Sequence, residues 1–168
     1  MINVKRYSKL NHLKHGEGDS TMEMYQQFLK EQIRHMESAI NTFELKDNIA
    51  VFRWASLSML KFFEKVRDSG GFFQDDGFVS TTAVVPKPVD NLIEVKIGVP
   101  AGMGRGAWIA PMSMFPEEAE FVLQRGSIFQ VKDIVQEENN RWKIFIVLVG
   151  CSLKELSTVN ENIDKSNN

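Results

Sequence analysis

The stretch MFPEEAEFVL, residues 114–123, places two glutamates two residues apart in front of an apolar run. Successive side chains of an extended chain point to opposite faces, so we expect Glu118 and Glu120 on one face, about 6–7 Å apart along a strand. The other face then supplies core side chains, which are those of Ala119, Phe121 and Leu123. Two solvated carboxylates on an edge strand explain the same pattern, so the pair needs support from elsewhere in the chain.

The composition is that of an ordinary globular chain. Its 168 residues are 43% hydrophobic and 25% charged, which suits one domain with a substantial core. The formal net charge of −2 provides no basic face, so we expect no nucleic-acid partner. Cys151 is the one cysteine, which excludes an internal disulfide. Its place after an apolar run predicts a small buried side chain.

The N-terminal segment has no apolar core of the kind that a signal peptide carries, and no apolar run approaches the roughly 20 residues of a membrane helix. We therefore expect a monomer that acts in a cytoplasm without a membrane partner. Three regions are predicted, namely a flexible segment over residues 1–19, a single domain over 20–153 and a disordered tail over 154–168.

The spacing of apolar residues predicts helices first and strands afterwards. A capping-box pattern at residues 20–23, followed by apolar residues at three- and four-residue steps, predicts a helix over 21–43. A second helix is expected over 57–67. Strands are predicted between turn signals at 49–54, 77–82, 92–99, 107–110, 119–124, 128–136 and 142–149. This order is typical of an α+β domain.

Two further patterns resemble ligand sites but favour simpler explanations. The segment GMGRG, residues 102–106, lies between two predicted strands with no helix after it, which predicts a hairpin turn rather than a phosphate loop. His12 and His15 have the spacing of a ligand pair, but no third ligand or helix supports them. We therefore expect no metal.

Three stretches carry residues suited to one chemistry. Arg53 lies on the apolar strand AVFRW, where a buried guanidinium needs an anionic partner, either an internal carboxylate or a phosphate gripped bidentately. Three hydroxyls end the stretch GFVSTT, either as good strand formers or as donors that orient a carboxylate; they are those of Ser80, Thr81 and Thr82. The paired glutamates then follow an aromatic residue, Phe115.

As a set, these motifs resemble the mono-ADP-ribosyltransferases of the bacterial toxin class, which carry an Arg, Ser-Thr-Ser, Glu-x-Glu signature. VFRW resembles the first-strand arginine, GFVSTT the aromatic–x–Ser-Thr-Ser/Thr strand, and EEAEFVLQRGSIFQV the Glu-x-Glu strand with its successor. GAWIAPMSMFPEEAEFVLQRG is similar throughout to the C3-like exoenzymes and the actin-modifying binary toxins. The similarity covers about residues 49–137. It implies N-terminal helices followed by two packed, bent antiparallel or mixed sheets, with NAD in the cleft between them.

The resemblance also implies a role for each matching residue. Arg53 would hold the NAD phosphates, and the main chain of Trp54 would meet the nicotinamide amide. Ser80 would orient Glu120. Glu120 would bind the ribose hydroxyl next to the scissile bond and stabilise the cationic ribose as nicotinamide leaves.

Further positions follow from the same resemblance. Thr81 and Thr82 would complete the NAD-binding motif, and Lys87 would add a phosphate contact from the loop AVVPKPVDN, which lacks the aromatic residue of many relatives. Phe115 would touch the target protein. Glu118 would orient and deprotonate the acceptor; it is glutamate as in the arginine-modifying members, where the Rho-modifying members have glutamine. A carboxylate suits an acceptor guanidinium, which keeps its charge at neutral pH.

The sequence therefore predicts an NAD-dependent mono-ADP-ribosyltransferase that modifies an arginine side chain of a target protein and releases nicotinamide. NAD is the expected substrate, and no metal is involved. Two alternatives stay open at this point. One is an NAD glycohydrolase, in which water replaces the acceptor, and the other is a catalytically inactive binding module or virion component that retains the fold.

Overall fold

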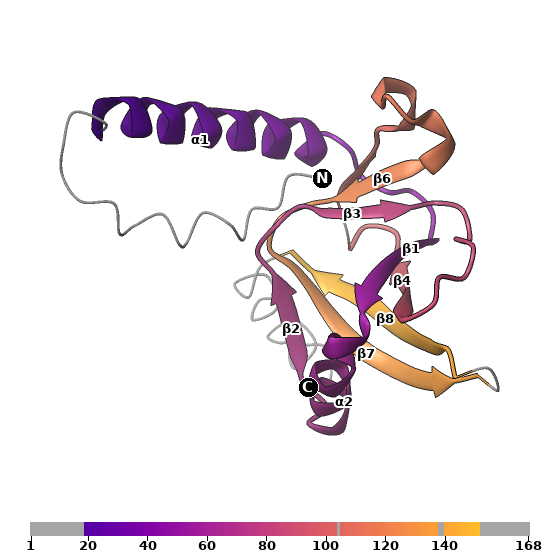
Figure 1. Cartoon of the computed structure of the whole chain (residues 1–168). Coiled ribbons are helices and arrows are strands. Elements are labelled where there is room, and N and C mark those ends of the chain that lie inside the picture. The colour runs from indigo at the N-terminus through magenta and orange to yellow at the C-terminus, as the bar shows by residue number, and fades with distance from the viewer. Residues whose placement is uncertain (1–18, 104, 138–139, 152–168) are drawn as a thin grey trace, which may run out of the picture. The chain divides into compact units, whose positions relative to one another are not determined.

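The computed structural model describes residues 19–103, 105–137 and 140–151 (Figure 1). The chain divides into two compact units, Met1–Ala39 and Ile40–Asn168. Except for Asp19, the predicted flexible segment and the predicted tail lie outside the described residues, as do His12 and His15. The single domain over 20–153 stays a prediction.

The first unit contains most of α1, Asp19–Asn41. The periodic apolar spacing predicted this helix, and its observed ends lie two residues before the predicted ones, a shift that is usual for helix ends. The helix therefore begins before Ser20, the residue expected to cap it.

The second unit contains eight strands among its described residues, all in one hydrogen-bonded sheet with the order β2-β7-β8-β4-β1-β3-β6-β5. Their bounds are β1 Ile49–Ser56, β2 Phe72–Asp75, β3 Val79–Thr82, β4 Leu92–Val99, β5 Gly106–Trp108, β6 Glu120–Leu123, β7 Ser127–Gln136 and β8 Trp142–Gly150. The pair β4–β8 is parallel and the other pairs are antiparallel. The α+β prediction is confirmed.

The link between β1 and β3 is the narrowest point of this sheet. These two strands share one register pair, Phe52↔Thr82, whereas β1 pairs with β4 along its whole length and β3 does so with β6. Residues 53–56 of β1 and 79–81 of β3 lie on the same side of that pair but do not pair with each other. The two expected sheets are therefore two parts of one sheet that meet at a single residue pair.

A shared core holds the two parts together. It is built from one face of the sheet and includes Val51 of β1, Val95 of β4, Ile144 of β8, and Phe121 and Leu123 of β6, all between 0% and 6% exposed. Because side chains from both parts belong to one cluster, the two parts are held together by packing as well as by hydrogen bonds. Burial of Phe121 and Leu123, and of Ala119, confirms the core face expected from the sequence.

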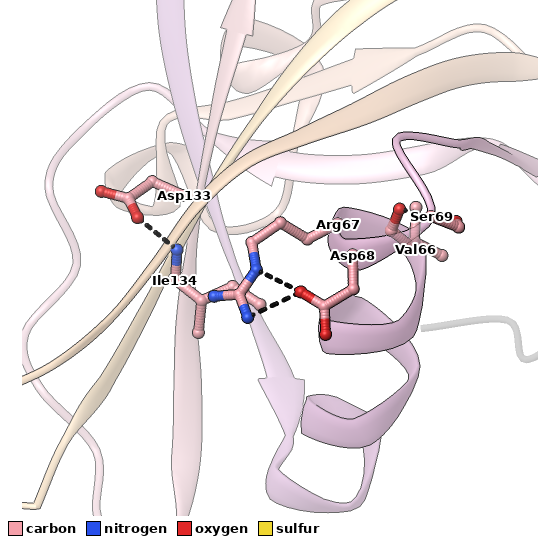
Figure 2. A network of polar contacts seen from close by, with 6 residues as sticks. All are labelled: Val66, Arg67, Asp68, Ser69, Asp133 and Ile134. Atoms are coloured by element: carbon pink, nitrogen blue, oxygen red, sulfur yellow. Dashed lines mark hydrogen bonds and ion pairs between the residues drawn. The ribbon is translucent and has the colours of Figure 1, made fainter.

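One helix covers part of this core. The predicted second helix forms as a 3-10 turn, η2 Leu57–Met59, followed by α2 Leu60–Asp68, which packs against β7. At its end the Ser69 hydroxyl donates to the Val66 carbonyl at 2.9 Å, and Arg67 pairs with Asp68 at 2.9 Å (Figure 2). Gly70 follows with φ of +63°, a left-handed value that ends the helix.

Several local predictions for this unit were wrong. Strand β2 was not predicted, because it is short and follows two glycines. The strand expected over 107–110 ends at Trp108, and Pro111 lies in a 3-10 turn, η3 Ala110–Met112. The segment 102–106 is not a hairpin turn, since β5 pairs with β6 rather than with β4. Cys151 is partly exposed rather than buried.

Gly106 provides a test of the packing between β5 and β6. A Cβ atom at this position would overlap the ring of the buried Phe121 and lie 3.1 Å from the Val122 carbonyl oxygen. We expect Gly106→Ala to lower the free energy of unfolding by about 1–3 kcal/mol, because the ring has to move within a filled core. Thermal or urea denaturation measures this loss.

The matched control is Gly98→Ala in β4, where the nearest atoms would lie at 3.6 and 3.8 Å, ordinary contact distances. This variant should keep nearly the full stability. Equal losses in the two variants would contradict the close approach of β5 to Phe121.

Candidate active site

A hydrogen bond across β3 and β6 forms the centre of the candidate site. The Ser80 hydroxyl donates to Oε1 of Glu120 at 2.6 Å. The two residues are 40 positions apart in sequence but lie on adjacent antiparallel strands, which run side by side in Figure 1. The bond that the family resemblance implies is present. It fixes one carboxylate oxygen of Glu120.

The pairing of β3 with β6 places the other two hydroxyls differently. Thr82 lies directly opposite Glu120, so its side chain shares a face with Glu120 and Ser80. Its hydroxyl oxygen accepts from the Val84 amide at 3.2 Å and holds the start of the following loop. Thr81 points to the opposite face, is buried, and donates to the Phe121 carbonyl at 2.6 Å. Thr81 therefore serves the fold, and no contact places it at the site.

The expectation that Glu118 and Glu120 lie on one strand face was wrong. Glu118 ends a 3-10 turn, η4 Pro116–Glu118, and Ala119 has φ of +46° and ψ of +48°. Glu120 is then the first residue of β6. A left-handed alanine is strained by about 1–2 kcal/mol, and such strain often marks a functional site. Here it separates the two carboxylates, so that Glu118 belongs to the loop and Glu120 to the sheet.

The loop before Glu118 presents apolar side chains to solvent. Phe115, predicted to contact the target, is 55% exposed, and Met112 and Met114 beside it are 81% and 89% exposed. The loop backbone is held by two local bonds, from the Phe115 amide to the Ser113 hydroxyl at 3.0 Å and from the Glu118 amide to the Phe115 carbonyl at 3.0 Å. An apolar surface next to a free carboxylate is therefore built on an ordered turn.

Arg53 differs from the expectation of a buried guanidinium. Its side chain is 39% exposed, and Nη1 lies 3.7 Å from Oδ2 of Asp75 on β2. The sequence allowed two anionic partners for Arg53, an internal carboxylate or a phosphate, and in the structure an internal carboxylate, that of Asp75, lies beside it. Among the described residues, no N–H of this guanidinium is hydrogen-bonded, since 3.7 Å exceeds hydrogen-bond distance. Its donors therefore stay available to a ligand.

Trp54 lies next along β1, beyond the pair Phe52↔Thr82. Its side chain lines a surface crevice together with Pro88 and Val89, so the loop that follows β3 returns to β1 at this position. Lys87, in the same loop, is exposed. The structure thus brings the loop of Lys87 to Trp54, while no contact joins Lys87 to the Ser80–Glu120 pair.

Asp75 is the residue at this site that sequence reasoning missed. The signal was present in Asp75-Asp76-Gly77, a typical turn sequence, because an Asp side chain can accept a hydrogen bond from the amide two residues later. That bond forms, from the Gly77 amide to Oδ1 of Asp75 at 3.0 Å.

No group of three or more His, Cys, Asp and Glu side chains in the described part of the chain is placed to hold a metal ion. No helix there is long and apolar enough to cross a membrane.

Comparison with known proteins identifies the class to which this fold and site belong. The architecture is that of the ADP-ribosyltransferases. The family model described as ADP-ribosyltransferase exoenzyme matches residues 4–150, and the chain therefore belongs to this family. No curated protein sequence matches it. The chemistry of the family is NAD-dependent ADP-ribosyl transfer.

Solved structures agree on the fold. The chain is similar to the C3 exoenzyme of Clostridium limosum, with 21% identity, a TM-score of 0.63 and coverage of 73% of this chain and 69% of that one. C3stau2 of S. aureus, solved with NAD, has 19% identity, a TM-score of 0.59 and coverage of 73% and 71%. BECa, an ADP-ribosylating toxin of a C. perfringens binary enterotoxin solved with NADH, has 16% identity, a TM-score of 0.64 and coverage of 81% and 38%.

Neighbouring hydroxyls on β3 allow a test that separates function from stability. Ser80→Ala removes the donor that aims Glu120, and we expect nicotinamide release from NAD to slow about tenfold or more. Its free energy of unfolding should change by about 1 kcal/mol or less, because Ser80 is exposed and water can replace the hydroxyl.

Thr81→Val should show the opposite pattern, because it removes the buried hydrogen bond from the hydroxyl to the Phe121 carbonyl at a cost of about 0.5–1.5 kcal/mol. Both rates and both melting curves are measured on the same preparations. If Ser80→Ala loses stability as Thr81→Val does, Ser80 is a structural hydroxyl.

Proposed function

We propose that the protein transfers ADP-ribose from NAD to an arginine side chain of a target protein and releases nicotinamide. The observation that carries this proposal is the bond from Ser80 to Glu120, 2.6 Å long, at the edge where β1 and β3 cease to pair. Family membership supports the use of NAD. The choice of arginine rests on Glu118.

The leaving step depends on Glu120. Its Oε1 is fixed by Ser80, which leaves Oε2 for the ribose hydroxyl beside the scissile bond. As the bond between C1′ and the nicotinamide nitrogen breaks, its electron pair moves to nicotinamide and positive charge develops on the ribose. A carboxylate already held in place stabilises this charge without reorganising during the reaction. Arg53, with its hydrogen-bond donors available, holds the phosphates.

The acceptor step depends on Glu118. An arginine nitrogen attacks C1′ and must lose a proton, and the exposed carboxylate of Glu118 can both bind the guanidinium and accept that proton. Glu118 lies on the exposed η4 turn rather than on β6, which supports a role toward the incoming target protein. The exposed side chains of Phe115, Met112 and Met114 then contact the surface around the acceptor arginine.

Two glutamate variants test the division of labour. Glu120→Gln removes the charge that stabilises the cationic ribose, so transfer to an arginine analogue and hydrolysis of NAD should both fall by about 10²–10³. Glu118→Gln keeps that charge. We expect it to abolish transfer while slow hydrolysis of NAD to ADP-ribose continues. Nicotinamide release and label transfer are measured together on both variants.

The same assay decides between the alternatives. Free ADP-ribose with no transfer by the wild-type protein would indicate an NAD glycohydrolase, and no turnover at all would indicate a binding module that retains the fold. Loss of both activities to the same extent in the two variants would contradict separate roles for Glu118 and Glu120.

A further inference from the structure

We infer that Asp75 is a positioning residue for NAD binding, which acts by holding the Arg53 guanidinium at the narrow link of the sheet. This inference rests on the proposed function, because it assigns to Arg53 the NAD phosphates. It adds a residue on β2, a strand that carries none of the family motifs described above.

Asp75 is itself held firmly in place. Its backbone pairs with Ser127 at the end of the β2–β7 ladder, and its carbonyl accepts from the Gly126 amide at 2.8 Å. Its Oδ1 accepts from the Gly77 amide at 3.0 Å. Two contacts thus hold the backbone of Asp75 and a third holds its carboxylate, with Oδ2 facing Arg53.

The geometry of the ion pair orients the Arg53 guanidinium without occupying its hydrogen-bond donors. At 3.7 Å, Oδ2 attracts the guanidinium of Arg53 without taking a hydrogen bond from it. An arginine can offer a planar pair of N–H groups to a phosphate, which binds strongly only when that plane is correctly set. Asp75 can therefore limit the rotation of the side chain and leave the donors for the ligand. NAD therefore does not have to displace a hydrogen bond between Arg53 and Asp75.

The same contacts connect both parts of the sheet. Gly126 lies in the turn between β6, which begins with Glu120, and β7, which pairs with β2. Arg125 in that turn donates from Nε to the Asp76 carbonyl at 2.9 Å. Asp75 thus relates the position of Arg53 on β1 to the strand that carries Glu120. A shift of either strand would change the distance between the phosphate contact and the ribose contact.

The opposing effect is repulsion, because the Asp75 carboxylate and the NAD phosphates have like charge. Removal of the Asp75 charge would strengthen NAD binding if repulsion dominated and weaken it if orientation did. Both side chains of the pair are about 40% exposed, and solvent screens charges at this exposure. Screening weakens the ion pair as well as the repulsion, but a phosphate bound by Arg53 lies farther from Asp75 than the guanidinium does, and charge interactions weaken with distance. We therefore expect orientation to be the larger effect.

The test is the affinity for NAD, by calorimetry, and KM and kcat for nicotinamide release. Asp75→Asn removes the charge and keeps an Oδ1 acceptor for the Gly77 amide, so the turn is preserved. We expect the dissociation constant and KM for NAD to rise about two- to fivefold, the range that corresponds to an ion pair of this exposure, with a smaller change in kcat. The melting temperature should not move.

The matched control is Asp76→Asn, which makes the same charge change one residue away. The Asp76 side chain accepts from Gln74 at 2.7 Å, a bond that asparagine keeps. NAD affinity should match the wild type. Asp75→Ser is a second variant, which also removes the charge and retains an acceptor, in case Asp75→Asn fails to fold.

A double variant tests whether Asp75 acts through Arg53. With Lys at position 53 there is no guanidinium plane to orient, so adding Asp75→Asn to Arg53→Lys should weaken NAD binding no further. An equal loss in both backgrounds, or unchanged or tighter binding in Asp75→Asn alone, would overturn the inference. If the wild type binds NAD and Asp75→Asn binds it equally well, the inference about Asp75 fails but the proposed function stands. If the wild type does not bind NAD, the inference and the proposed function both fail.

Discussion

The single pair Phe52↔Thr82 is the constraint on which the site depends. Had β1 and β3 paired along their whole length, the backbone of residues 53–56 would be occupied by ladder bonds to β3. Because pairing stops after one pair, the backbone beyond it is free of that ladder on the side toward β3. The shared core, with Val51 and Phe121 in one cluster, keeps the strands from closing or separating further. Packing thus maintains the lack of pairing between β1 and β3 beyond Phe52↔Thr82.

The residues of the proposed mechanism are distributed over the two parts of the sheet that meet at this link. The first part of the sheet supplies Arg53, held by Asp75, and the backbone of Trp54, while the second part supplies Ser80 and Glu120. In the proposed binding mode, NAD contacts the first part through its central phosphates and the second part through the ribose next to nicotinamide. The η4 turn before β6 then supplies Glu118, which the left-handed residue Ala119 joins to the strand. In the proposed mechanism, the sheet thus positions the residue of the leaving step and a surface turn positions the residue of the acceptor step.

Residues with strong periodic or chemical patterns allowed most of the fold to be predicted. Apolar patterns predicted the strands β4 and β8 and the core face of β6. The family motifs predicted the association of Ser80 with Glu120. The backbone at Ala119 could not be predicted, because alanine carries no signal for positive φ and tertiary bonds hold it there. The four residues of β2 lack a long pattern, so Asp75 could not be placed near Arg53 before the sheet order was known.

The most direct test of this account is the response of backbone amides to NAD, measured by two-dimensional NMR of ¹⁵N-labelled protein. If one NAD molecule bridges the two parts of the sheet, amide signals should shift on both strands that share the pair Phe52↔Thr82, in residues 53–56 of β1 and in residues 79–82 of β3, together with those of residues 118–120. Shifts restricted to one of these two strands, or absent from both at saturating NAD, would contradict the claim that one NAD molecule bridges the two parts of the sheet.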